Sequence, residues 1–199
     1  MLLPVYPSTF RNRVPILSIL KKHLPLKGKV IETASATGEH IVFFAKEFPG
    51  LQWYPSDKSD KFFWAIKKRS GSLHNIEDPT CIDLTTTCYI QSKPKFHALL
   101  NINMIHIAPW EACRGLFKLS NNIILKNGLV FLYGPFKENG KKLANTNNEF
   151  DTQLKLQNPS WGIRLLEDVV MVAEEFGFTF LRKYEMPTNN LSIVFIKSI

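Results

Sequence analysis

Short apolar segments alternate with amphipathic segments along the chain, and this alternation predicts a series of strands and helices. Five apolar segments have the length of strands: 28–34, 51–57, 79–84, 95–106 and 128–136. Five further segments carry apolar residues at helical spacing: 15–24, 39–48, 61–70, 110–125 and 164–178. Segment 95–106 is nearly continuous apolar sequence, which is typical of a central strand buried on both faces. The pattern therefore predicts an α/β protein.

The C-terminal part of the chain departs from this alternation in two places. Residues 137–162 are polar and rich in Asn and Lys, and they are too long for an ordinary connection, so we expect an inserted lid at about 137–160. Residues 179–187 and 191–199 have the character of strands, and the Thr-Asn-Asn between them predicts a hairpin. No linker divides the chain, so we expect one domain over residues 1–199, with an N-terminal helix at about 12–24.

Strands that alternate with helices and end in a hairpin predict a doubly wound, mostly parallel sheet. In such sheets the ligand binds outside the carboxyl ends of the strands. The first strand ends in Glu32, and small residues follow it as far as Gly38. The second ends at Asp57, at a spacing from Gly38 that suits a carboxylate bound to both hydroxyls of a ribose. The third ends at Asp83, whose carboxylate suits an adenine amino group. Together these strand ends predict a nucleoside pocket.

The composition narrows the possible partners. The net charge of +8 favours solubility, or attraction to an anionic substrate or a polyanion. The basic clusters at 67–70 and 137–142 are the densest, but no nucleic-acid recognition motif accompanies them. The chain has no apolar run of 18 or more residues, so we expect no membrane span. The three cysteines, Cys81, Cys88 and Cys113, form no C-x-x-C pair, which favours a cytoplasmic protein without structural zinc.

Seven strings spread over nearly the whole chain carry a family resemblance. They are RNRVPIL (11–17), ETASATGEH (32–40), FPGLQWYPSD (48–57), NINMIHIAP (101–109), LYGPF (132–136), NPSWGIR (158–164) and MPTNN (186–190). In order and spacing they resemble the class I S-adenosylmethionine (SAM)-dependent methyltransferase superfamily, and more closely the methyltransferase-like protein 26 family. The resemblance implies a Rossmann-like sheet of seven mostly parallel strands, the last antiparallel, with helices on both faces and SAM as cofactor.

The same resemblance implies which residues bind the cofactor. The stretch from Glu32 to Gly38 matches the superfamily loop E/D-x-G-x-G-x-G, Asp57 matches its ribose ligand and Asp83 its adenine neighbour. The segment from Asn103 to His106 matches the one beside the transferable methyl group. Arg11 precedes a helix that often caps the cofactor in this superfamily, and it could pair with the methionyl carboxylate.

The loop departs from this pattern, since Ala34 and Ala36 replace the first two glycines. Glycine lets a backbone approach a ligand and adopt positive φ angles. A methyl group there costs little if φ is negative, but about 1 kcal/mol or more if φ is positive. The two alanines therefore leave the affinity of the loop for a cofactor open.

The chemistry of methyl transfer suggests candidates for the remaining roles. The displacement is in line, so the protein mainly holds the nucleophile and excludes water. His106 is the candidate general base and Asn103 a second catalytic candidate, although a lone histidine is more often structural. We expect an aromatic, cationic pocket for a planar or anionic substrate, formed by Asn12, Tyr133, Asn139, Trp161 and Arg164. The other histidines lack metal-ligand spacing, so we expect no metal.

The sequence thus predicts a SAM-dependent methyltransferase that acts on an unidentified small-molecule acceptor. One alternative is a methyltransferase-fold binding protein with weak or lost turnover, acting through a protein or RNA partner, which Ala36 favours. Another is a nicotinamide-dependent oxidoreductase, but the terminal hairpin and the lack of a G-x-G-x-x-G string count against it.

Overall fold

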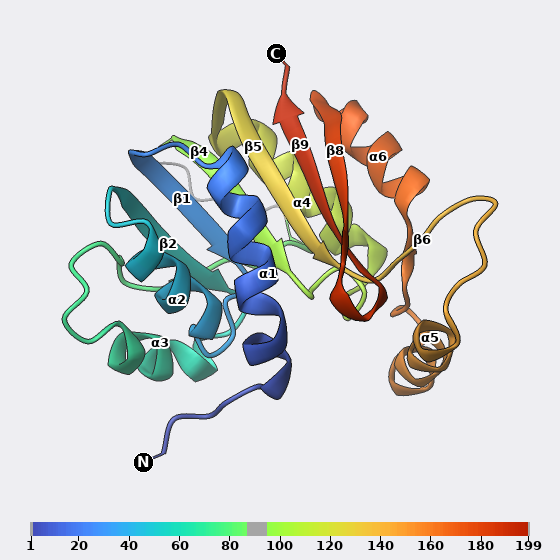
Figure 1. Ribbon diagram of the computed structural model, residues 1–199, viewed down its shortest axis with the longest axis horizontal. Coiled ribbons are helices and arrows are strands. Elements are labelled where there is room, and N and C mark those ends of the chain that lie inside the picture. Colours follow the sequence, from blue (N-terminus) through green and yellow to red (C-terminus); the bar gives the residue numbers. More distant parts are fainter. Residues whose placement is uncertain (1, 87–94, 199) are drawn as a thin grey trace.

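The computed structural model describes residues 2–86 and 95–198, and a seven-stranded sheet forms its centre (Figure 1). The strands of this sheet are β1 (Gly28–Thr33), β2 (Leu51–Asp57), β3 (Thr80–Cys81), β4 (Phe96–Ile102), β5 (Ile124–Gly134), β8 (Phe178–Met186) and β9 (Asn190–Lys197). They lie in the order β3-β2-β1-β4-β5-β9-β8. Strand β9 is antiparallel to both of its neighbours, and the other pairs are parallel. The predicted Rossmann-like sheet with an antiparallel last strand is confirmed.

Helices cover both faces of the sheet (Figure 1). The helices are α1 (Pro7–His23), α2 (Glu39–Glu47), α3 (Phe63–Ser70), α4 (Trp110–Ile123), α5 (Asn145–Gln157) and α6 (Leu166–Glu175), with short 3-10 turns η1 (Asp60–Phe62) and η2 (Pro187–Asn189). Successive residues of β1 serve opposite faces: Val30 packs with α1 and α2, whereas Ile31 packs with α4 and α6. This is why the central strands need apolar residues at every position.

Helix α1 begins at Pro7, earlier than the expected start at about residue 12. Proline suits the first turn of a helix, because its missing N–H would have no helical partner there, and Pro7 occupies that position. Pro15 lies inside the helix. It cannot donate to the carbonyl of Arg11, but the buried side chains of Ile16 and Leu20 hold the helix against the sheet across this point.

Two strands are shorter than their apolar sequence suggests. Strand β3 comprises only Thr80 and Cys81, although 79–84 was the expected span. Strand β4 ends at Ile102 rather than continuing toward residue 106, because Asn103 adopts a left-handed φ of 57° that turns the chain. The residues after β4 therefore leave the sheet and become available to line a site.

The polar segment 137–162 contains helix α5, which the sequence pattern did not predict because few of its residues are apolar. Its buried residues include Asp151, which accepts hydrogen bonds from Lys137, Lys155 and the backbone N–H of Ile163. Burial raises the pKa of Asp151, but these hydrogen bonds outweigh it and hold the pKa below its usual range. The segment is thus anchored through one carboxylate, and its role as a lid stays a prediction.

A small parallel sheet joins the two ends of this segment. It consists of β6 (Phe136–Lys137) and β7 (Arg164–Leu165), which flank α5 in the chain. Strand β6 follows directly from β5, so α5 is held beyond the edge of the main sheet (Figure 1). The insertion therefore begins and ends at this small sheet, and its two ends are hydrogen-bonded side by side.

Within residues 2–86 and 95–198 no helix is both long and apolar enough to cross a bilayer. Cys81 is an exposed free thiol and Cys113 a buried one, and burial raises the pKa of Cys113 to about 12. Cys88 lies outside the described residues.

Candidate functional site

A first cavity of about 460 Å³ opens at the carboxyl ends of β1, β2 and β4. It brings together five residues that the sequence singled out: Ala34, Ala36, Asp57, Asp83 and Asn103. This is the end of a doubly wound sheet at which ligands bind. Trp161, expected in the substrate pocket, also lines this first cavity.

The turn after β1 has the backbone conformation of a glycine-rich loop, although alanine replaces its first two glycines. Ala34 has a φ of 57° and Ala36 a φ of 47°, both in the left-handed region that alanine avoids. Gly38, with a φ of 79°, is the N-cap of α2, and it is absent from the cavity lining. Strained backbone of this kind costs of order 1–3 kcal/mol per residue and clusters at functional sites. The loop therefore keeps the glycine-type conformation despite its two methyl groups.

The carboxylate of Asp57 joins the loop to the second strand. Its Oδ2 accepts a hydrogen bond from the backbone N–H of Ala36 at 3.0 Å, and its Oδ1 accepts one from Ser59 at 3.3 Å. Each oxygen retains a lone pair, so the carboxylate can still accept from a ligand in the cavity. Asp57 thus has both a structural role and the position expected of a ribose ligand.

Asp83 stands at the other side of the cavity, after β3. The side chain and the backbone N–H of Thr85 both donate to its Oδ1, at 2.7 and 2.8 Å. These two hydrogen bonds lower the pKa of Asp83. The carboxylate is therefore ionised at neutral pH, as an acceptor for an amino group requires.

Glu32 lies beneath the loop and does not line either cavity described here. Its side chain is buried, and its Oε2 has no hydrogen-bond partner. Burial raises the pKa of Glu32 to about 7, an effect that hydrogen bonding with Ser35 opposes and the nearby charge of Asp57 reinforces. The structure thus places this carboxyl as a support of the loop, a role that the sequence did not suggest.

The N-terminal segment before α1 covers one side of the first cavity. The backbone N–H of Tyr6 donates to Glu39 at 2.9 Å, and the guanidinium of Arg69 donates to the carbonyls of Pro4 and Thr37. Tyr6 and Glu39 both line the cavity. The sequence analysis missed these residues, and Pro7 as a helix start was the available signal that the chain is ordered before residue 12.

A second cavity of about 450 Å³ adjoins the first. Ser8, Asn103 and Ile107 line both cavities. The backbone N–H of Asn103 donates to the carbonyl of Tyr133 at 2.8 Å, which fixes the turn between the cavities. A ligand in one cavity would therefore lie next to a ligand in the other, with Asn103 between them.

The second cavity contains several of the predicted residues, but not all of them. Arg11, Asn12, His106 and Tyr133 line it, so Arg11 faces this cavity rather than the first. Helix α5 contributes Asn147 and Phe150, and the connection between β8 and β9 contributes Pro187, Thr188 and Asn190. None of them was a predicted site residue, although the string MPTNN (186–190) was the available signal for the last three.

His106 is buried in the wall of the second cavity. Its ring packs edge-to-face against Phe150, with centroids 5.7 Å apart, and its Nδ1 has no hydrogen-bond partner. Burial, with a smaller contribution from the charge of Arg164, lowers the pKa of His106 to about 4. The imidazole is therefore neutral at physiological pH and can accept a hydrogen bond, and the lowered pKa makes it a weaker base than a free imidazole.

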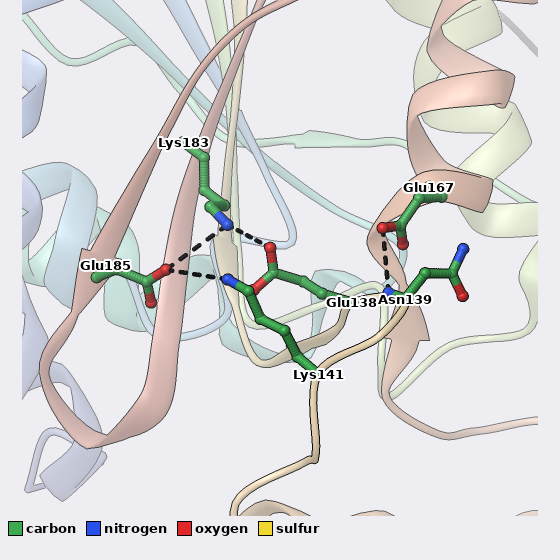
Figure 2. A network of polar contacts seen from close by, with 6 residues as sticks. All are labelled: Glu138, Asn139, Lys141, Glu167, Lys183 and Glu185. Carbon is green, nitrogen blue, oxygen red and sulfur yellow. Dashed lines mark hydrogen bonds and ion pairs between the residues drawn. The ribbon is translucent and has the colours of Figure 1, made fainter.

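Two predicted substrate residues line neither cavity. Arg164 donates to the carbonyls of Ile105, Ala108 and Ser160, so its guanidinium holds the segment after β4 in place. Asn139 is exposed, and its backbone N–H donates to Glu167 in a polar cluster that also includes Glu138, Lys141, Lys183 and Glu185 (Figure 2). Arg164 therefore stabilises the segment after β4, whereas Asn139 lies outside both cavities.

The described residues contain no group of three or more His, Cys, Asp or Glu side chains placed to hold a metal ion.

The fold of this chain matches that of solved methyltransferase structures. Solved structures with this fold include human N-acetylserotonin methyltransferase in complex with SAM, at a TM-score of 0.79 and 12% identity, covering 96% of this chain and 53% of that one. An O-methyltransferase family protein from Burkholderia thailandensis matches at 0.79 and 12%, covering 96% and 57%. A methyltransferase of calicheamicin biosynthesis, bound to S-adenosylhomocysteine, matches at 0.71 and 14%, covering 94% and 54%.

The architecture is thus the Rossmann-like fold of class I methyltransferases, and the chain spans little more than half the length of these structures. The chain itself belongs to the family described as Protein of unknown function (DUF938), whose model matches residues 4–197.

Proposed function

We propose that the protein is a SAM-dependent methyltransferase that acts on a small-molecule acceptor. The observation that carries this proposal is the pair of cavities that share Ser8, Asn103 and Ile107. One has ionisable carboxylates at strand ends, and the other has a buried neutral histidine. A methyl donor and its acceptor need two such adjoining sites.

The residues of the first cavity fit SAM. Asp57 and Asp83 would accept hydrogen bonds from the ribose and the adenine, and the left-handed backbone at Ala34 and Ala36 lets the loop approach the ligand closely. When bound, SAM supplies a methyl group on a sulfonium that an aligned nucleophile displaces. Asn103, between the cavities, would orient the two ligands.

In the second cavity, His106 would act as the general base if the nucleophile arrives protonated. Its imidazole is neutral and lines the cavity, and the ring of Phe150 packs against it. The pocket also includes Tyr133 and Asn12 as polar contacts.

A small molecule is favoured over a nucleic acid because two of the three lysines of the 137–142 cluster have other partners. Lys137 pairs with Asp151, and Lys141 pairs with Glu138 and Glu185 (Figure 2). The methyltransferases named above for N-acetylserotonin and for calicheamicin biosynthesis also concern small molecules. The narrower likeness to the methyltransferase-like protein 26 family rests on sequence strings and stays a prediction, as does a cytoplasmic location.

The alternative is a methyltransferase-fold binding protein that turns SAM over weakly or not at all. The strained alanines at 34 and 36, together with the Ala36–Asp57 hydrogen bond, favour it, because they could hold the loop in a conformation too costly to adjust to the cofactor. Calorimetric titration with SAM, S-adenosylhomocysteine and NAD decides among the functions. Saturable binding of the two sulfur compounds supports the proposal, whereas binding of NAD alone, or of none, refutes it.

Replacing Ala36 by Gly should leave the affinity for S-adenosylhomocysteine equal or tighter. The φ of 47° costs alanine about 1 kcal/mol or more, and glycine relieves this strain while losing about 0.5–1 kcal/mol through backbone entropy. Stability should therefore change by less than about 1 kcal/mol. Ala144→Gly, at a φ of −58°, is the control without strain to relieve. Tenfold weaker binding by Ala36→Gly would identify the methyl group as a ligand contact.

Helix α5 should become protected from hydrogen exchange when cofactor and acceptor are both bound, because Asn147 and Phe150 line the second cavity. Exchange across 137–160 is measured with and without the ligands. In Asp151→Ala, which removes the anchor for Lys137, Lys155 and Ile163, exchange should be faster in the free protein. Protection induced by RNA but not by small ligands would contradict the lid.

A further inference from the structure

A chain of polar side chains connects the two cavities through α1. The Nε2 of His40, which lines the first cavity, lies 2.7 Å from the Oδ1 of Asn12. Asn12 and Tyr133 both line the second cavity, and both are buried. The three residues come from α2, α1 and β5.

The proton positions along this chain follow from its geometry. The Oδ1 of Asn12 carries no proton, so His40 must donate from Nε2. Burial raises the pKa of Tyr133, against smaller lowering effects of Asn12 and Arg11, so its hydroxyl stays protonated at neutral pH. The hydroxyl can therefore donate to a group in the second cavity.

The lining of the second cavity matches an anion. The described residues that line it include no Asp or Glu, and they include one cation, Arg11. Arg11 is exposed, and no ion pair joins it to a carboxylate of residues 2–86 or 95–198. Its charge also acts on Tyr133, where it lowers the pKa against the larger effect of burial. Guanidinium and hydroxyl thus line the same cavity as two donors.

The remaining wall is apolar and suits a ring. Phe150, Pro135, Pro187 and Ile107 line the cavity. At about 450 Å³ the cavity is of the size that takes a small molecule. A single guanidinium balances a single negative charge, so a carboxylate fits better than a phosphate, which carries up to two.

We propose that the acceptor of this protein is a small molecule that carries a carboxylate, and that Arg11 and Tyr133 bind this group in the second cavity. The proposal rests on the proposed function, because it takes the second cavity as the acceptor site. The Tyr133 hydroxyl, on a buried side chain and protonated at neutral pH, is the second donor. Arg11 thereby takes the role that the sequence analysis gave to Arg164.

Benzoate, benzamide and benzylamine test the charge preference, because they share a ring and differ in charge. Each is titrated into the ¹⁵N-labelled chain with saturating S-adenosylhomocysteine, whose own binding is first measured by calorimetry. Benzoate should bind at least tenfold more tightly than benzamide, a difference of about 1.4 kcal/mol, with shifts at residues of the second cavity. Benzylamine should bind most weakly.

Variants assign the preference to its residues. Arg11→Gln and Tyr133→Phe should each reduce the preference for benzoate to less than threefold. Arg182→Gln, which removes one exposed positive charge from a residue that lines neither cavity, should keep it. Equal binding of benzamide, no saturable shift with benzoate, or a preference that survives in Arg11→Gln overturns the inference. Failure of S-adenosylhomocysteine to bind overturns the proposed function instead, whatever benzoate does.

Discussion

Replacing Glu32 by Gln should raise the free energy of unfolding by about 3 kcal/mol at pH 8 and leave it nearly unchanged near pH 4. Burial raises the pKa of Glu32 from 4.5 to about 7, with Ser35 opposing and Asp57 reinforcing the shift. Between these two values the folded chain holds a proton that the unfolded chain has released, so stability falls as the pH rises. Above pH 7 the full cost, about 3 kcal/mol, is present, and the neutral glutamine avoids it.

Chemical denaturation at several pH values measures this effect. Glu174→Gln, at an exposed position, is the matched control and should change stability by less than about 0.5 kcal/mol at every pH. A difference between Glu32→Gln and the parent that does not grow between pH 4.5 and 7 would contradict the assignment. The affinity of Glu32→Gln for S-adenosylhomocysteine separates two roles of Glu32. If Glu32 only supports the loop, the affinity of the variant should stay within threefold of the parent's. If Glu32 contacts the ligand directly, the affinity should change by more than threefold.

Replacing Asp57 by Ala should weaken the binding of S-adenosylhomocysteine by about 1–3 kcal/mol, the range for loss of a charged hydrogen-bond partner. Asp57 lines the first cavity at the end of β2, where a carboxylate can bind a ribose. It also accepts from the N–H of Ala36, so the alanine variant additionally loosens the strained loop. Calorimetric titration of the folded variant measures the total loss.

Two further variants make this experiment specific. Asp57→Asn keeps the side chain's size and an oxygen for Ala36, so the part of the loss that it reproduces belongs to the charge. Asp60→Ala removes an exposed carboxylate close by in the chain that lines neither cavity, and it should bind like the parent. Unchanged affinity in folded Asp57→Ala would remove Asp57 from the site.

Much of the fold was predictable because its central strands are apolar at successive positions. Residues such as Val30 and Ile31 pack on opposite faces of the sheet, and that requirement is visible in the sequence. Helix α5 was not predictable in this way, because it is held by the buried carboxylate of Asp151 rather than by an apolar stripe. The end of β4 depended on the single backbone angle at Asn103.

Part of the candidate site follows from local sequence alone. Ala34, Ala36, Asp57 and Asp83 each stand just after a strand or at its end, and parallel strands bring their carboxyl ends to one edge of the sheet. Any sequence that folds into this sheet must therefore bring these positions together. The position of the first cavity was in this sense determined by the order of strands along the chain.

Only the tertiary structure decided the second cavity and the direction of its polar groups. The sequence alone does not distinguish the roles of Arg11 and Arg164. In the structure Arg11 lines the cavity, whereas the guanidinium of Arg164 donates to three backbone carbonyls. The His40–Asn12 hydrogen bond joins residues of two separate helices. The physical reason is that a side chain's partners depend on how helices and turns pack across the sheet, and neither strand order nor local pattern specifies that packing.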